Sequence, residues 1–405
     1  MKEFELKNGI KSVYKQNPET PRIALTLNFS INDEEKLAGT YSLMSRLLMQ
    51  GTKKYNNEQI ATLLDENGIQ IITDMKQDYL RFRVLCLNED FSKAIKILED
   101  LVKNSTFIEF DKEKEKMQGE LMAELDSARL QISDAFVKTA YENHYYGHTF
   151  TNVLKDIEKI TKEDVLSAYK TIMDTSKKVV SVVGSVDNDQ VISLVKSAFE
   201  DLPNNNDAKK SFTKPVLDKF KKVEVVKKDA QQAQIYQGWY APVYSDDDYP
   251  VIMVINTILG SSGLSSRLFR ELREKKGLAY TVRTSCEAKE LAGLFNIYIA
   301  TEPSNIEISL QGFKEEIDKI KTILVSEEEL KNAKNNIFGK HQFISETNFQ
   351  QSTSMAYYGI NGLPFNHFDT MAEKIKAVTS EQIMECANKY FNENSVIAIL
   401  HPELY

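Results

Sequence analysis

The two halves of this chain follow the same order of predicted elements, which indicates an internal duplication. Each half is predicted to open with a short strand, at residues 9–14 and 222–227, and to continue with an apolar helix. A second helix then ends at a glycine in each half, Gly68 and Gly277, and both suit the left-handed conformation that closes a helix. Copies of about 200 residues are too long for a solenoid repeat, so two homologous domains are expected.

The two halves also close in the same way. Thr161 with Asp164, and Thr379 with Gln382, have the spacing of helix N-cap pairs, and each helix leads into an apolar strand. Residues 22–31 alternate apolar with polar or small side chains, which is typical of a strand. Strands and long helices are mixed without strict alternation, which favours an α+β fold.

A polar segment divides the chain near its middle. Residues 202–215 include two prolines and have no apolar periodicity, which is typical of a linker. We therefore predict a first domain at residues 1–205, a linker at 206–221 and a second domain at 222–405.

Composition excludes several classes of function. The formal net charge of −8 argues against nucleic acid as the main partner. Cys86, Cys286 and Cys386 are widely spaced and odd in number, so they predict neither a disulfide framework nor a zinc ribbon. No apolar run approaches the roughly 20 residues that a membrane span requires, and the N-terminus has no apolar signal core. The sequence therefore predicts a cytoplasmic protein.

The most informative segment spans residues 260–280. A loop of small residues, Gly-Ser-Ser-Gly-Leu-Ser-Ser, leads into a helix that ends at Gly277 and turns into a strand at Tyr280. This stretch resembles the signature of the second domain in the insulinase, pitrilysin and mitochondrial processing peptidase family. Length, duplication, linker and the closing helix and strand extend the resemblance to the whole chain. It implies two homologous α+β domains, each a sheet with helices on one face, arranged as a clamshell.

The same resemblance implies a role for Arg273 and Tyr280. In the family, an arginine and a tyrosine seven residues apart reach from the second domain to the substrate, and these two residues have that spacing. A guanidinium is a fork of donors for a carbonyl or carboxylate, and a phenol can donate to the oxyanion that forms at the scissile carbonyl. At the repeat offset their counterparts are Leu64 and Ile71, so the first half lacks the polar pair. Without the flanking match, Arg273 would be read as a solvated helix residue and Tyr280 as a packed strand residue.

Active members of the family carry the inverted zinc motif His-x-x-Glu-His on a helix of the first half. That spacing places two imidazoles on one helical face, with a carboxylate that activates the water on the metal. Here the matching helix spans residues 39–52, and the three positions are Ser42, Ser45 and Arg46. None of them is a good zinc ligand, and Arg46 would place a fixed positive charge near the vacant metal position. The helix itself is retained, because it keeps one apolar stripe, formed by Tyr41, Met44, Leu47 and Leu48.

The remaining candidate ligands do not form a metal site. The third ligand of the family, a glutamate, is matched by Glu124, and the glutamate seven residues before it is replaced by Met117. A single carboxylate cannot hold a metal, so an ion pair between Glu124 and Arg46 is predicted instead. His144 and His148 are four residues apart, but no carboxylate lies between them and a glycine interrupts any helix, so zinc is not expected there.

Together these observations predict a non-catalytic, substrate-binding subunit of a heterodimeric zinc metalloendopeptidase that acts on peptides. This chain would carry no metal or other cofactor and would be inactive alone. Arg273 and Tyr280 would act in trans on an unfolded peptide, bound as an extra strand in a homologous, zinc-bearing partner. Neither nucleic acid nor a membrane is expected as a partner. Two alternatives remain: a non-enzymatic scaffold or peptide-binding protein of the same fold, and a homodimer with a rebuilt metal site.

Overall fold

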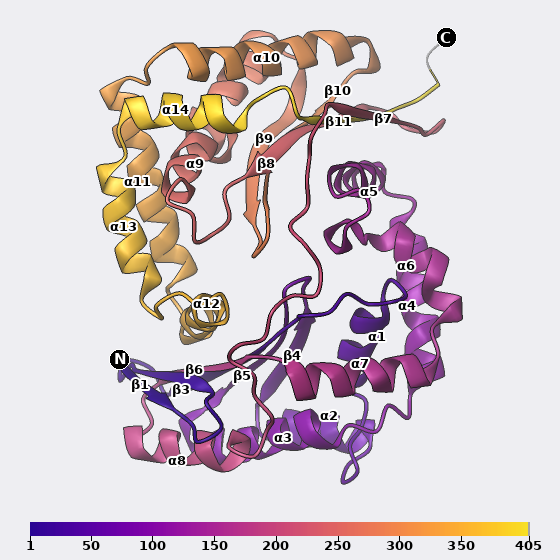
Figure 1. The fold of residues 1–405 in the computed structure, drawn as a ribbon, viewed down its shortest axis with the longest axis vertical. Coiled ribbons are helices and arrows are strands. Elements are labelled where there is room, and N and C mark those ends of the chain that lie inside the picture. Colours follow the sequence, from indigo (N-terminus) through magenta and orange to yellow (C-terminus); the bar gives the residue numbers. More distant parts are fainter. Residues whose placement is uncertain (404–405) are drawn as a thin grey trace. The chain divides into compact units, whose positions relative to one another are not determined.

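The computed structural model describes residues 1–403, which fall into two compact units, each built on one β-sheet (Figure 1). Unit 1 comprises residues 1–120, 152–212 and 342–367, and unit 2 comprises residues 121–151, 213–341 and those from 368 onwards. Within the described part of the chain, no helix has both the length and the apolar character needed to cross a membrane.

The sheet of unit 1 has six strands, in the order β1-β2-β6-β3-β5-β4. Strand β2 is parallel to β6, and all other neighbours are antiparallel. The strands are β1 (Lys2–Glu5), β2 (Lys11–Gln16), β3 (Arg22–Ser30), β4 (Gln70–Met75), β5 (Tyr79–Leu87) and β6 (Lys178–Gly184). Strands β3 and β6 are buried along almost their whole length, since both faces of the sheet are covered at its centre.

The helices of unit 1 come mostly from the first half of the chain. They are α1 (Thr40–Leu47), α2 (Asn57–Glu66), α3 (Phe91–Asn104), α4 (Phe110–Glu124), α6 (Phe150–Asp156), α7 (Lys162–Thr175), α8 (Asn188–Phe199) and α12 (Asn348–Ile360), with short turns η1 (Asn88–Asp90) and η3 (Ile157–Lys159). Helix α12, from the second half, lies across β3 and β6. The predicted apolar stripe is confirmed on α1 and on Leu48, which directly follows it, because its four side chains are at most 5% exposed.

The sheet of unit 2 has five strands, in the order β7-β11-β8-β10-β9. They are β7 (Lys221–Val226), β8 (Ala233–Ala241), β9 (Ala279–Ala288), β10 (Gly293–Thr301) and β11 (Val396–His401). Strand β7 is parallel to β11, and the other neighbours are antiparallel. This connectivity repeats that of β2, β6, β3, β5 and β4, so the predicted α+β class and the duplication are confirmed.

The helices of unit 2 cover both faces of its sheet. They are α5 (Ala128–Ala140), α9 (Tyr249–Asn256), α10 (Ile306–Thr322), α11 (Glu327–Ile344), α13 (His367–Ala377) and α14 (Ser380–Tyr390), with turns η2 (Tyr145–Gly147), η4 (Thr257–Ser261), η5 (Gly263–Ser265), η6 (Phe269–Lys275) and η7 (Pro303–Asn305). The main core joins α9, α10 and α14 to the apolar side of β8 and β10, around Ile235, Phe295 and Phe313. Helix α5, from the first half, contacts β7, β8 and β11. Each half of the sequence thus contributes one helix to the sheet of the other half.

The boundaries that the sequence predicted for several helices are present. Gly68 and Gly277 have φ angles of 57° and 63°, in the left-handed region that favours glycine. Both N-cap pairs form full capping boxes, at Thr161 before α7 and at Thr379 before α14. Residues 201–220 contain no helix or strand, and they connect α8 to β7.

Candidate functional site

Arg273 and Tyr280 contact one another in unit 2. Arg273 lies on the π-helical turn η6, and its Nη1 donates a hydrogen bond of 2.7 Å to the carbonyl oxygen of Tyr280. Its guanidinium carbon lies 4.7 Å from the centre of the Tyr280 ring and 4.6 Å from that of Phe269. Cation–π attraction to two rings holds this side chain in place. A guanidinium has five N–H groups, so donors remain for a ligand.

A β-bulge turns the Tyr280 side chain into solvent. In the β9–β10 ladder, Ala279 pairs with Thr301 and Thr281 pairs with Ala300, so Tyr280 is the extra residue. Regular alternation would place Tyr280 on the same side as Val282, which is 6% exposed, yet Tyr280 is 79% exposed. Its hydroxyl has no hydrogen-bond partner among residues 1–403 and is open to a ligand.

The turn between the two residues is closed by a short set of backbone hydrogen bonds. The N–H of Gly277 donates to the Arg273 carbonyl at 3.2 Å, and the N–H of Leu278 donates to the Leu272 carbonyl at 2.9 Å. The left-handed φ of Gly277 reverses the chain direction here. This turn therefore brings side chains seven residues apart in sequence into contact. Both π-helical turns and β-bulges occur frequently at functional sites.

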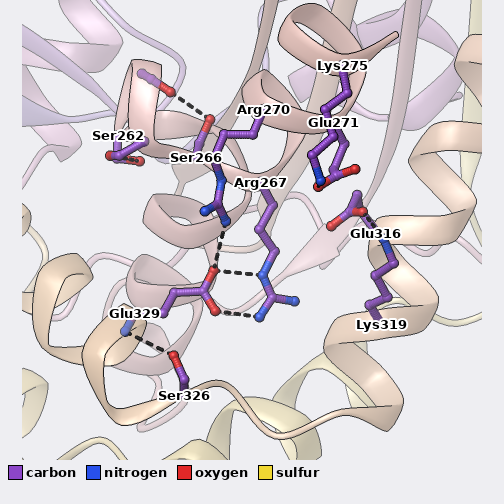
Figure 2. A network of polar contacts seen from close by, with 12 residues as sticks. Ser262, Ser266, Arg267, Arg270, Glu271, Lys275, Glu316, Lys319, Ser326 and Glu329 are labelled. Atoms are coloured by element: carbon purple, nitrogen blue, oxygen red, sulfur yellow. Dashed lines mark hydrogen bonds and ion pairs between the residues drawn. The ribbon is translucent and has the colours of Figure 1, made fainter.

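An ion-pair network fixes the start of the helix that carries Arg273 (Figure 2). Arg267 donates from Nε and Nη2 to the two carboxylate oxygens of Glu329, at 2.8 and 2.6 Å. Only 13% of the Arg267 side chain and 24% of the Glu329 side chain are exposed. Burial opposes the charge on Arg267, but the hydrogen bonds and the charge of Glu329 outweigh it and raise the pKa of the guanidinium. Arg270 lies 3.9 Å from the same carboxylate.

In unit 1, α1 presents the three positions that match the zinc motif. Ser45 is buried, and its hydroxyl donates to the Ser42 carbonyl at 3.0 Å. The Ser45 carbonyl in turn accepts a hydrogen bond of 3.1 Å from the Thr73 hydroxyl on β4. The bond from Thr73 ties α1 to β4, the edge strand of its sheet, through the backbone of Ser45.

The predicted ion pair between Arg46 and Glu124 is wrong, because Arg46 pairs with Glu120. Both glutamates lie on α4, and Glu120 is one helical turn earlier than Glu124. The hydrogen bond from Arg46 is the main cause that holds the pKa of the Glu120 carboxyl below its usual range. The position in the sequence alone pointed to Glu124, which lies one helical turn after the actual partner, Glu120.

The zinc ion that the family implies does not fit this helix. Two hydroxyls and a guanidinium replace two imidazoles and a carboxylate, and a guanidinium has no lone pair to donate. Within residues 1–403, no three His, Cys, Asp or Glu side chains are grouped so that they could hold a metal ion.

His144 is engaged within the fold of unit 2. Its Nδ1 accepts from the Tyr146 N–H at 3.0 Å, and its Nε2 lies 2.8 Å from the Thr213 carbonyl oxygen. Both ring nitrogens are therefore used, so this ring does not provide a metal ligand together with His148.

The repeat counterparts of the Arg–Tyr pair differ in burial: Leu64 on α2 is only partly buried, whereas Ile71 is an ordinary core residue. Ile71 lies on β4 in regular register with Val84 and is 8% exposed. Strand β4 has no extra residue at this point, in contrast to β9. The second unit thus differs from the first in both its side chains and its backbone.

Arg267 and Glu329 were not among the site residues that the sequence predicted. They are 62 residues apart, and no local spacing links them. The signal that the sequence offered was the position of Arg267. It directly follows the serine-rich loop and precedes the apolar residues that begin the helix.

Comparison with known proteins identifies two adjacent matches to one family. The model described as "Insulinase (Peptidase family M16)" matches residues 11–154, and the one described as "Peptidase M16 inactive domain" matches residues 159–337. An "uncharacterized zinc protease" of Rickettsia felis is 26% identical and covers 98% of this chain and 97% of its own. "Non-peptidase homolog YmxG" of Helicobacter pylori is 26% identical and covers 92% of this chain and 87% of its own.

Solved structures agree on the fold. A protease from Helicobacter pylori is 20% identical to this chain, with a TM-score of 0.91 over 99% of each chain. An identity this low shows the fold alone. The two family matches follow one another along most of the sequence, and they coincide with the duplicated α+β architecture. The chain therefore belongs to the insulinase family of peptidases, M16, and its residues 159–337 match the domain of that family that is described as inactive.

Proposed function

We propose that this chain is the non-catalytic, substrate-binding subunit of a heterodimeric zinc metalloendopeptidase that acts on peptides. One contrast carries the proposal. Unit 2 presents Arg273 in contact with an exposed Tyr280, whereas α1 of unit 1 has Ser42, Ser45 and Arg46 in place of zinc ligands. A relative bearing the name "non-peptidase homolog" supports the absence of catalysis in a protein of this type.

Each of the two residues has a distinct role in the proposed complex. The remaining N–H groups of Arg273 bind a carbonyl or carboxylate of the peptide. The Tyr280 hydroxyl donates a hydrogen bond to the oxygen that gains negative charge at the scissile carbonyl. The contact between them orients both groups before the peptide binds, since the guanidinium rests on the ring and on the backbone carbonyl of Tyr280.

The partner in this proposal is a homologous chain that bears His-x-x-Glu-His and carries the zinc. This chain holds no metal or other cofactor of its own, and its substrate is an unfolded peptide. The cytoplasm as its location stays a prediction from the sequence.

The test is co-expression with a family member from the same genome that carries the zinc motif. The purified chain alone should cleave no peptide, and the complex should cleave one. Tyr280→Phe should lower kcat about a hundredfold, as does removal of one oxyanion donor elsewhere. Arg273→Ala should lower kcat/KM. Lys275→Ala is the matched control, because Lys275 lies on the same turn and makes an exposed pair with Glu271.

Unchanged rates in both the Arg273 and Tyr280 variants would overturn the assigned roles. If no zinc-bearing chain associates with this one, the scaffold or peptide-binding function is favoured instead. Cleavage by the isolated chain, together with bound metal, would favour the rebuilt homodimer.

A further inference from the structure

A polar and aromatic row crosses the face of the unit 2 sheet on which α5 lies. Tyr298 on β10 is directly opposite Tyr236 on β8 and Arg283 on β9, so the three side chains share one face. The centres of the two tyrosine rings are 4.8 Å apart. The Tyr298 hydroxyl donates to Gln234 Oε1 at 2.7 Å, and the residue is 4% exposed. The row is therefore a fixed aromatic base with an arginine at one end.

A second arginine reaches the same ring from α5. The guanidinium carbons of Arg129 and Arg283 lie 5.5 and 5.6 Å from the centre of the Tyr298 ring. Helix α5 is anchored beside them by Phe136, whose ring stacks on Tyr236 at 5.1 Å. Gly238 permits this approach, because a Cβ there would lie 2.5 Å from Phe136 Cζ. Helix α5 packs on the sheet of unit 2 (Figure 1). This packing sets the position of Arg129.

Neither arginine is neutralised by an acid. Both are exposed, and in the described part of the chain neither forms an ion pair with a carboxylate. Glu287 on β9 and Asp126 before α5 are the nearest acidic residues in sequence, and they make no such pair with them. The first turn of α5 contains no acidic residue, so the partial positive charge of the helix N-terminus adds to that of the arginines.

We infer that Arg129 and Arg283 form a binding site for a carboxylate of the peptide substrate. A guanidinium binds a carboxylate through two parallel hydrogen bonds, and stacking on an aromatic ring orients its fork. Arg129 also hydrogen-bonds to the Tyr236 side chain, and the rest of its five N–H groups stay available to a ligand. Arg283 follows Tyr280 by three residues on β9, or about 10 Å along a strand. Strand β9 is the edge of its sheet, so a peptide that lies along this edge and contacts Tyr280 passes the two arginines a few residues away. This inference rests on the proposed peptide-binding function and specifies its substrates as peptides with an acidic side chain or a free C-terminal carboxylate at that distance.

The test measures binding by the isolated chain, with no partner and no cleavage. The probes are three labelled peptides of about twelve residues, otherwise uncharged: one with a central Glu and an amidated C-terminus, one with Gln in its place, and the Gln peptide with a free C-terminus. Fluorescence anisotropy at low salt should show the wild type binding a carboxylate-bearing peptide about tenfold tighter than the amidated Gln peptide. A preference for the Glu peptide identifies a side chain as the ligand, and a preference for the free C-terminus identifies a terminal carboxylate.

Variants of the two arginines show whether these residues cause the preference for a carboxylate-bearing peptide. Arg129→Gln and Arg283→Gln should each reduce it, and the double variant should abolish it while leaving the affinity for the amidated Gln peptide unchanged. Arg283→Lys should retain part of it, because the charge remains. Lys331→Gln, an exposed cation on α11, is the matched control for loss of charge and should have no effect.

Three results would overturn the inference: equal affinity of the wild type for all three peptides, no binding of any of them, or a preference that survives in the double variant. Arg273→Ala should keep the preference for carboxylate. Failure of this site is therefore distinguishable from failure of the proposed role of Arg273 in cleavage.

Discussion

Arg46 on α1 forms an ion pair with Glu120 on α4, at the position that the sequence resemblance matches to the second histidine of the family's zinc motif. The pair is partly solvated, since 34% of the arginine side chain and 47% of the glutamate side chain are exposed. The guanidinium has no lone pair that could bind a metal. It forms its ion pair with the Glu120 carboxylate instead. The positive charge of Arg46 is therefore balanced within the same unit.

The Arg46–Glu120 pair should contribute little to stability. A double-mutant cycle with Arg46→Ala and Glu120→Ala should give a coupling below about 1 kcal/mol at pH 7, as for other solvated pairs. Because Arg46 lowers the pKa of Glu120, the contribution is present above the pKa of the carboxyl in the unfolded chain. It should be lost as the pH falls through the lower, folded value. Urea denaturation over a series of acidic pH values measures this. A coupling of several kcal/mol, or one independent of pH, would contradict the prediction.

The Arg267–Glu329 pair should matter more, because it is largely buried. Arg267→Ala leaves the Glu329 carboxylate without its two hydrogen bonds, and we expect the free energy of unfolding to fall by about 2 kcal/mol, less than for a fully buried pair. Arg270→Ala is the matched control: it removes a half-exposed arginine 3.9 Å from the same carboxylate and should cost under about 1 kcal/mol. Equal losses in the two variants, measured by urea denaturation, would show that the bidentate geometry does not stabilise this segment.

Lys178 should make stability rise with pH in the alkaline range. The side chain is fully buried, and Nζ donates to the carbonyls of Met173 and Ser176 at 2.8 and 3.1 Å. Burial is the main cause that lowers the pKa of Lys178 to about 8 from its usual 10.5. Between those values the unfolded chain binds more protons than the folded one, so unfolding becomes less favourable as the pH rises, by at most about 1.4 kcal/mol per pH unit.

The lysine contribution is isolated by comparison with variants. Lys178→Met should remove this rise between pH 8 and 10.5, whereas Lys170→Met, an exposed position on α7, should keep it. Thermal or urea unfolding at each pH gives the difference between the variants. An identical pH dependence in wild type and Lys178→Met would refute the effect.

The sequence predicted those features that depend on local rules. Left-handed φ angles select glycine, so Gly68 and Gly277 could be placed as helix ends. Capping at Thr161 and Thr379 depends on residues three positions apart, so these helix starts could also be predicted from the sequence. The duplication then predicted two sheets of one connectivity, because the same local pattern occurs twice.

Other features depend on contacts between distant segments. Helical periodicity shows which face of α5 or α12 is apolar, but it does not show which sheet that face covers. The bulge at Tyr280 depends on the pairing of β9 with β10, and no residue in the segment signals it. In the same way, Arg129 and Arg283 both contact the ring of Tyr298 because of the strand register and the packing of α5.

Two glycines of the 260–280 segment should respond very differently to an added methyl group. At Gly260, on η4, a Cβ would lie 2.4 Å from the backbone nitrogen of Thr284, which belongs to β9 and cannot move alone. Gly260→Ala should therefore cost more than about 2 kcal/mol, as overpacking does when the neighbour is backbone. At Gly277 a Cβ meets nothing within 4 Å, and only the left-handed φ of 63° is unfavourable. Gly277→Ala should thus cost about 1 kcal/mol. Urea denaturation compares the two, and a smaller loss for Gly260→Ala would contradict the close approach of η4 to the strand that carries Tyr280.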